Sequence, residues 1–378
     1  QKSGFNLINF LVFASLASLV LRRVAGKGKM VWFPHEMWWA YLVPIALAVF
    51  VAWPYLPIGE MNFPPRVDIL AESSYAPVPF LKTKVIKPLF FVVYAFILMN
   101  AVRDSKKPER FLLVLGLSAL LPAVAIIVEV LSGVDVNDRK HFLADLGLQV
   151  NEYGTLLAFA AGPLLFIAAG KGPLTARAAA AVAFAVSTVA MVMTASRGAV
   201  LALAVVVVVF LLRRRRLSDL LIAISLAAVM AVIAPDAVID RLVMGFDDLG
   251  STGVHNSDDP LTKGRIALWA ALAPEFSGSP LWGHGLSSTG WNSAVTTGRV
   301  SMGHPHNLYL AILLDLGLLG GLAMLYLSYR IARSLRRLSD ESSLSATMRD
   351  FFAGAFAAYL GFLCASVTGS SYTPHPEQ

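Results

Sequence analysis

Charge is scarce in this sequence. Asp, Glu, Lys and Arg make up only 15% of its 378 residues, whereas soluble domains carry about a quarter. Hydrophobic residues account for 57%, and the mean hydropathy is +0.66. This balance excludes an ordinary soluble domain and predicts an all-α fold, a polytopic bundle of membrane-spanning helices.

Cysteine and the common cofactor motifs are also missing. The single cysteine, Cys364, has no second cysteine with which to form an intrachain disulfide. No P-loop, GxGxxG, CxxC or HExxH pattern is present. We therefore expect no cofactor and no metal. Four aspartates of a Gly-rich stretch offer oxygen ligands for a divalent ion, but adjacent aspartates in such loops are more often solvated; they are Asp247, Asp248, Asp258 and Asp259.

Long apolar runs are abundant by contrast. A helix needs about 20 apolar residues to cross the hydrocarbon of a bilayer. Runs near this length predict about ten spans, at 5–21, 38–56, 85–102, 111–131, 152–169, 176–194, 198–212, 217–234, 307–328 and 349–367. The chain then divides into transmembrane helices with short loops over 1–234, a large and partly helical loop over 235–305, and helices with a C-terminal segment over 306–378.

Cations gather in alternate short loops. Most of the 31 Lys and Arg residues lie there, including Arg22, Arg23, Lys27, Lys29, Arg103, Lys106, Lys107, Arg110, Lys171, Arg177, Arg213 to Arg216, Arg330, Arg333, Arg336, Arg337 and Arg349. Because short cationic loops stay in the cytoplasm, we expect the 235–305 loop on the opposite face. Ten spans place both chain ends on that outer face, so we also expect the complete protein to have at least one further span.

Three side chains at the outer ends of apolar runs are candidates for chemistry. Arg197 lies between two such runs, where a guanidinium either snorkels to the interface or pairs with an anion. Arg265 lies near the start of a helix predicted from Pro260 to about Phe276, where the helix dipole favours an anion instead of a cation. An external anion bound there would explain why a cation lies at a helix start. Arg265 is about equally compatible with a solvated helix face.

His306 lies at the start of the span that begins with Leu308. Imidazole changes its charge near neutral pH and can therefore move a proton, but a histidine at a helix start is more often a cap or an interfacial residue. His304 precedes a proline and is expected in extended backbone. We assign Arg197, Arg265 and His306 as catalytic candidates, and Arg197, Arg265, His304, Asn307 and Lys263 as candidates for substrate binding. Asp315 is expected to brace the bundle.

Four segments, in this order, resemble the O-antigen ligase and polymerase superfamily. They are Ser196-Arg-Gly198, Gly264-Arg-Ile-Ala-Leu-Trp269, Pro280-Leu-Trp-Gly-His-Gly285, and His306-Asn-Leu-Tyr-Leu310 followed by Asp315-Leu-Gly-Leu-Leu-Gly320. The resemblance implies a metal-independent GT-C glycosyltransferase of the bacterial inner membrane, with about twelve spans and a periplasmic site. It implies that Arg197 and Arg265 hold the pyrophosphate of an undecaprenyl-linked glycan while His306 activates the acceptor hydroxyl.

The resemblance leaves the acceptor open. Ligation of O-antigen to lipid A-core is our first choice, and extension of the glycan by a polymerase or transfer to a protein hydroxyl are the alternatives. A transporter of an anionic solute or lipid is a hypothesis of another class. It predicts ionisable residues across the membrane midplane, whereas the runs at 176–194 and 198–212 are almost wholly apolar. A scaffold subunit without catalysis is the third hypothesis. Nucleic acid is not expected as a partner.

Overall fold

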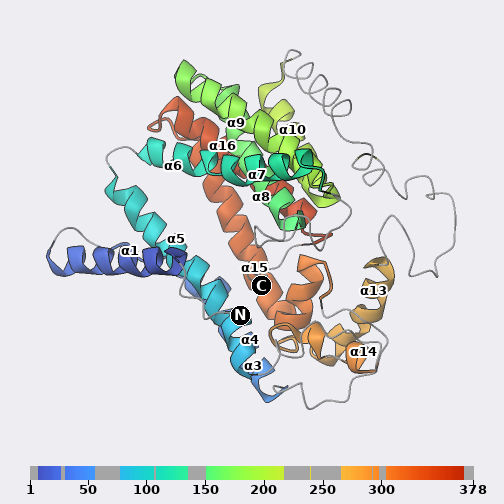
Figure 1. Cartoon of the computed structure of the whole chain (residues 1–378). Coiled ribbons are helices and arrows are strands. Elements are labelled where there is room, and N and C mark those ends of the chain that lie inside the picture. Colours follow the sequence, from blue (N-terminus) through green and yellow to red (C-terminus); the bar gives the residue numbers. More distant parts are fainter. Residues whose placement is uncertain are drawn as a thin grey trace.

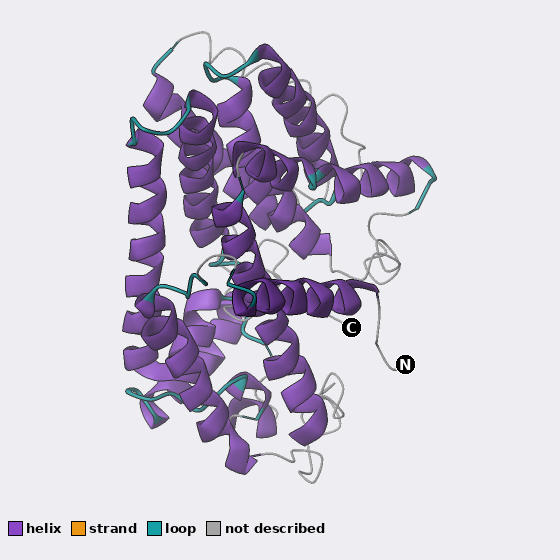
Figure 2. Ribbon diagram, turned by 90° about the vertical axis from the view of Figure 1, so that its left-hand side faces the viewer, coloured by secondary structure: helices purple, strands orange, loops and turns teal. Residues whose placement is uncertain are grey.

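The computed structural model describes residues 7–26, 30–55, 77–105, 108–134, 150–216, 239, 265–291, 293–297 and 304–369. The described part consists of helices and loops, with no strand among these residues (Figure 2). It is an all-α polytopic membrane fold, as the composition predicts. The predicted span 217–234 and most of the predicted loop 235–305 lie outside the described residues.

Six of the described helical stretches are long and apolar enough to cross a membrane: His35–Tyr55, Leu81–Asp104, Val150–Ala168, Leu174–Met193, Leu308–Asp340 and Ala346–Ala365. In chain order the elements are α1 (Leu7–Val24), α2 (His35–Met37), η1 (Trp38–Leu42), α3 (Val43–Ala52), η2 (Trp53–Tyr55), α4 (Pro77–Phe80), η5 (Leu81–Ile86), α5 (Lys87–Asp104), α6 (Pro108–Leu117), α7 (Leu120–Leu131), α8 (Val150–Ala168), α9 (Leu174–Met193), α10 (Arg197–Arg214), α13 (Arg265–Leu272), η7 (Ala273–Gly278), η8 (Ser288–Gly290), α14 (Ser293–Thr296), α15 (Leu308–Asp340) and α16 (Ala346–Ala365).

Helices α8, α9, α10 and α16 pack together as the core of the bundle (Figure 1). Helix α8 lies against α16 at Gly162 and Gly354, where a Cβ on either glycine would collide with the backbone of the other helix. Small residues at such crossings let membrane helices approach closely. This tight contact holds α16 against α8.

The single span predicted over 111–131 is wrong in one respect, because two helices occupy it. Helix α6 ends at Leu117 and α7 begins at Leu120. Pro122 lies in the first turn of α7. A proline cannot donate a backbone hydrogen bond, and its ring clashes with the carbonyl four residues earlier. The carbonyl of Ser118 therefore lacks the usual helical hydrogen bond from residue 122. A count of apolar residues does not detect this break.

Helix α15 also differs from the predicted span over 307–328. It continues to Asp340 and is broken at Gly317, where φ is 66° and ψ is −167°. The bend brings a Cβ built on Gly321 within 3.3 Å of Leu313 Cδ2, although the two residues would be about 12 Å apart along a straight helix. A glycine is needed here because a side chain at this φ is strained. The longer C-terminal part contains Arg residues that favour helix although they are not apolar.

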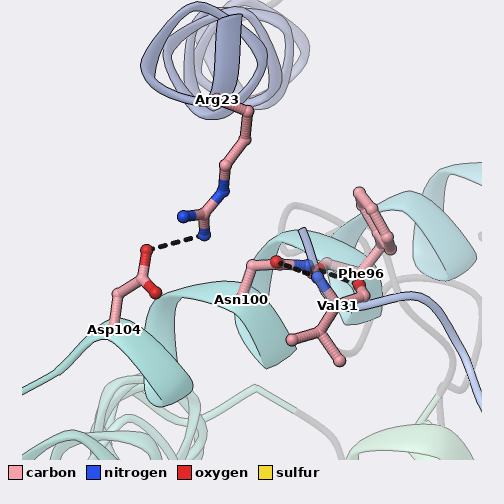
Figure 3. A network of polar contacts seen from close by, with 5 residues as sticks. All are labelled: Arg23, Val31, Phe96, Asn100 and Asp104. Carbon is pink, nitrogen blue, oxygen red and sulfur yellow. Dashed lines mark hydrogen bonds and ion pairs between the residues drawn. The ribbon is translucent and has the colours of Figure 1, made fainter. Parts of the chain in front are cut away.

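The cationic loops that the sequence places on one face are joined to one another by polar contacts. Arg23 in the last turn of α1 forms an ion pair with Asp104 at the end of α5, with 2.8 Å between Nη2 and Oδ2. In the same region the Asn100 side chain donates to the carbonyls of Val31 and Phe96 and accepts from the Val31 amide (Figure 3). We call this part of the molecule, together with the ends of α10 and α15, the arginine-rich end.

Candidate functional site

The turn that ends α16 is the point where three other elements meet. The amide of Leu308, at the start of α15, donates to the Ser366 carbonyl over 2.9 Å. Arg265, at the start of α13, donates through Nη1 to the Thr368 carbonyl over 2.5 Å. Gly198, in the first turn of α10, lies close enough to Thr368 that a Cβ there would be 3.3 Å from the hydroxyl oxygen. These contacts bring the neighbourhood of all three catalytic candidates to one place.

The loop before α15 holds its histidines in a defined geometry. The backbone amide of His306 donates to Nδ1 of His304 over 2.9 Å, so this nitrogen of His304 carries no proton. The two rings pack edge to face with 5.0 Å between their centroids. His306 has a φ of 49°, in the left-handed region that non-glycine residues rarely adopt. Strained backbone of this kind persists only where the surroundings impose it, and it is concentrated at functional sites.

Trp269 ties this loop to the helix that carries Arg265. Its indole Nε1–H donates to the carbonyl of Pro305 over 2.8 Å. Trp269 and Arg265 both belong to α13, four residues apart, so they lie on the same side of that helix. The hydrogen bond therefore sets the distance between the arginine and His306, the residue after Pro305.

Positive charge accumulates at this point. Burial and, secondarily, the neighbouring Arg197 lower the pKa of Arg265, although a guanidinium stays charged in proteins. Burial and, secondarily, the charge of Arg265 lower the pKa of His306 from its ordinary value of 6.5. The charge of Arg197 therefore affects the pKa of Arg265, and the charge of Arg265 affects the pKa of His306. The imidazole is kept neutral at neutral pH and is able to accept a proton.

The remaining sequence candidates have different places. Asn307 caps α15, since its Oδ1 accepts from the amides of Tyr309 and Leu310. His304 is next to His306, as described above. Lys263 and the aspartates at 247, 248, 258 and 259 lie outside the described residues. Within the described part, no three His, Cys, Asp or Glu side chains gather in a way that suits a metal ion.

Asp315 braces the structure, as the sequence predicts. Its carboxylate is buried and accepts from the Ser287 amide over 2.8 Å, the Ser288 amide over 2.8 Å and the Ser288 hydroxyl over 2.7 Å. The carboxylate thereby fastens the Pro280–Ser288 segment to the first half of α15. It acts on the scaffold of the site and is not one of the three interacting side chains.

Two contributors were not found from the sequence. The sequence shows Trp269 only as the last residue of the Gly264–Trp269 segment, and it gives Thr368 no role. A polar pair, Ser366 and Thr368, directly after an apolar span is the only sequence signal for this turn. The roles of both residues depend on contacts between parts of the chain that are about 40 to 170 positions apart, which local pattern does not reveal.

Comparison with known families agrees with these motifs. A family model described as O-antigen ligase matches residues 182–325 of the chain. The resemblance to the O-antigen ligase and polymerase superfamily is confirmed. The matched region contains Arg197, Arg265, Trp269 and His306, and it supports a glycosyltransferase-like enzyme that acts on a lipid-linked glycan and an acceptor. A search of curated proteins found no match.

The site can therefore bind an anion and move a proton. Planar guanidinium groups match phosphate oxygens in a two-pronged geometry, and two adjacent guanidinium groups suit a diphosphate. A neutral imidazole beside them can take a proton from a hydroxyl group. This combination fits the substrates that the family implies, a glycan on a lipid carrier and an acceptor.

Proposed function

We propose that this protein transfers a glycan from undecaprenyl pyrophosphate to an acceptor hydroxyl on the periplasmic face of a bacterial inner membrane. O-antigen ligation to lipid A-core is the reaction we put first. The family match supports the class of reaction, and the observation that carries the proposal is the meeting of Arg197, Arg265 and His306 at the turn that ends α16.

Arg197 and Arg265 hold the diphosphate in this mechanism. Burial and, secondarily, the charge of Arg197 lower the pKa of Arg265, and without a ligand the two guanidinium groups repel each other. A bound diphosphate relieves that repulsion and accepts charge-assisted hydrogen bonds. The same contacts stabilise the extra negative charge that develops on the diphosphate as it departs, which is electrostatic catalysis by fixed groups.

His306 acts as the general base. The acceptor oxygen forms a new bond to the anomeric carbon, and the imidazole takes the hydroxyl proton. The bond between that carbon and the diphosphate oxygen breaks, and undecaprenyl pyrophosphate leaves with the electron pair. Attack opposite the leaving group inverts the anomeric configuration. The proton on His306 then passes to solvent.

Transfer by purified protein in lipid nanodiscs is the decisive assay. One undecaprenyl-pyrophosphate-linked glycan is offered with lipid A-core, with a second copy of the lipid-linked glycan, or with a serine-containing protein. Glycosylated lipid A-core supports ligation, whereas a longer lipid-linked glycan or a glycosylated protein favours the other two acceptors. No transfer to any acceptor contradicts the proposal, and movement of intact donor across a sealed bilayer would favour a transporter.

A further inference from the structure

The turn at Pro280–Leu286 presents two large apolar side chains to the outside of the protein. Leu281 is 52% exposed and Trp282 is 61% exposed. Each side chain of this size loses the favourable free energy of burial when water surrounds it. Two such neighbours in one short turn form a contiguous apolar patch. A patch of this kind indicates contact with protein or lipid, whereas single exposed apolar residues are normal.

The surrounding sequence lacks charge. No Asp, Glu, Lys or Arg occurs from residue 276 to residue 298, whereas about a quarter of the residues in a soluble domain are charged. His284, the titratable group within the turn, is half-buried and shares a hydrogen bond of 2.7 Å between Nε2 and the Glu275 carbonyl. Residues 286 and 288–291 are buried, so the uncharged exposed surface is that of residues 277–282, which includes Leu281 and Trp282.

Six backbone groups of the turn are paired within the protein. The amides of Gly283, His284, Gly285 and Leu286 donate to the carbonyls of Ser279, Leu314, Asp315 and Ala48, over 3.0, 2.8, 3.0 and 2.9 Å. The carbonyls of Pro280 and Leu281 accept from the amides of Leu318 and Leu319, next to the break in α15. Non-helical backbone at membrane depth is tolerated only where protein covers its polar groups, and these six groups meet that condition.

The two exposed side chains adjoin a helix face of the same character. Leu318 and Leu319, whose amides hold the turn, are 43% and 46% exposed, and Leu322 one turn further is 60% exposed. They belong to α15, one of the helices apolar enough to cross a membrane. The apolar surface is therefore continuous from the membrane-facing side of α15 onto the turn.

We propose that Leu281 and Trp282 form a lipid-contact surface for the acyl chains of the leaflet on the site's side of the membrane. The turn then holds the segment that begins with α13, and with it Arg265, at the level of the lipid. The lipid contact itself concerns bulk membrane lipid, and its test does not depend on the proposed glycan transfer.

Site-directed spin labelling tests this surface without any activity assay. In a Cys364→Ala background, single cysteines are introduced as Leu281→Cys and Trp282→Cys, labelled with a nitroxide and reconstituted in lipid vesicles. Power saturation compares collision with oxygen, which partitions into lipid, and with a nickel chelate, which stays in water. Leu322→Cys is the lipid-facing reference, and Ser342→Cys, exposed between α15 and α16, is the aqueous reference.

The expected result is an oxygen-to-nickel ratio at positions 281 and 282 like that of Leu322→Cys. A ratio like that of Ser342→Cys would place the turn in water and overturn the proposal. Poor access to both reagents would mean that protein covers the patch, which also overturns it. Two labelled positions keep the test decisive if one of the variants does not fold.

Discussion

The arginines at the two ends of the molecule have different partners. At the arginine-rich end, guanidinium groups face carboxylates: Arg213 pairs with Asp340 over 2.8 Å and Arg330 pairs with Glu36 over 2.7 Å. At the site, Arg265 donates to a backbone carbonyl, and no carboxylate of the described residues pairs with it. Paired arginines fasten helices to each other, whereas Arg265, which has no carboxylate partner among the described residues, is prepared for an anion from outside.

The largest effect is expected at His306. His306→Ala should reduce the transfer rate by a factor on the order of 10² to 10⁴, the usual contribution of a general base, while donor binding is retained. His35→Ala is the matched control, because His35 is an exposed histidine at the opposite end. Equal loss of transfer and donor binding in the His306 variant would indicate a structural role and break the contrast between the ends.

The arginines come next. Arg197→Ala and Arg265→Ala should each weaken donor binding and turnover by more than about tenfold, because each removes a charge-assisted partner of the diphosphate. Lysine at either position should restore part of the loss, since it keeps the charge but lacks the fork. Arg213→Ala should change transfer little, since exposed ion pairs contribute about 0 to 1 kcal/mol to stability. Wild-type rates in both site variants would remove these residues from the mechanism.

A smaller effect is expected at Trp269, which positions the site without touching substrate. Trp269→Phe keeps an aromatic ring and loses the hydrogen bond to Pro305, which is worth about 1 kcal/mol, or about fivefold in rate. The reduction should appear in kcat, with the KM for donor nearly unchanged. Trp32→Phe is the control, since Trp32 is exposed and packs on Phe96. A purely structural role for Trp269 would lower the amount of folded protein and leave kcat of the folded fraction unchanged.

The smallest change concerns pH. Because burial and Arg265 lower the pKa of His306 below 6.5, the imidazole is neutral and active at neutral pH, and transfer should fall only when the pH drops below that lowered pKa. Arg265→Gln removes a positive neighbour, so protonated His306 is less disfavoured and its pKa should rise towards 6.5. The pH profile of residual single-turnover transfer measures this shift. A midpoint that stays constant or moves to lower pH would contradict the electrostatic coupling.

Sequence alone predicts the class and most helices because burial in hydrocarbon is a property of composition over long windows. It misses the breaks near Ser118 and at Gly317, since those depend on a proline and a glycine within otherwise apolar runs. It selects Arg197, Arg265 and His306 because charges beside apolar runs are costly unless they are used. It cannot supply the contacts through Trp269 and Thr368, because they arise only when distant segments pack.

Donor binding tests the central claim most directly. Equilibrium binding of undecaprenyl pyrophosphate to the protein in nanodiscs is measured for the wild type, Arg265→Gln, His306→Ala and Arg213→Gln. Our account predicts a loss of affinity of more than about tenfold for Arg265→Gln and affinities near the wild-type value for the other two variants. Unchanged affinity in Arg265→Gln, or an equal loss in Arg213→Gln, would contradict the assignment of the diphosphate to this end of the molecule.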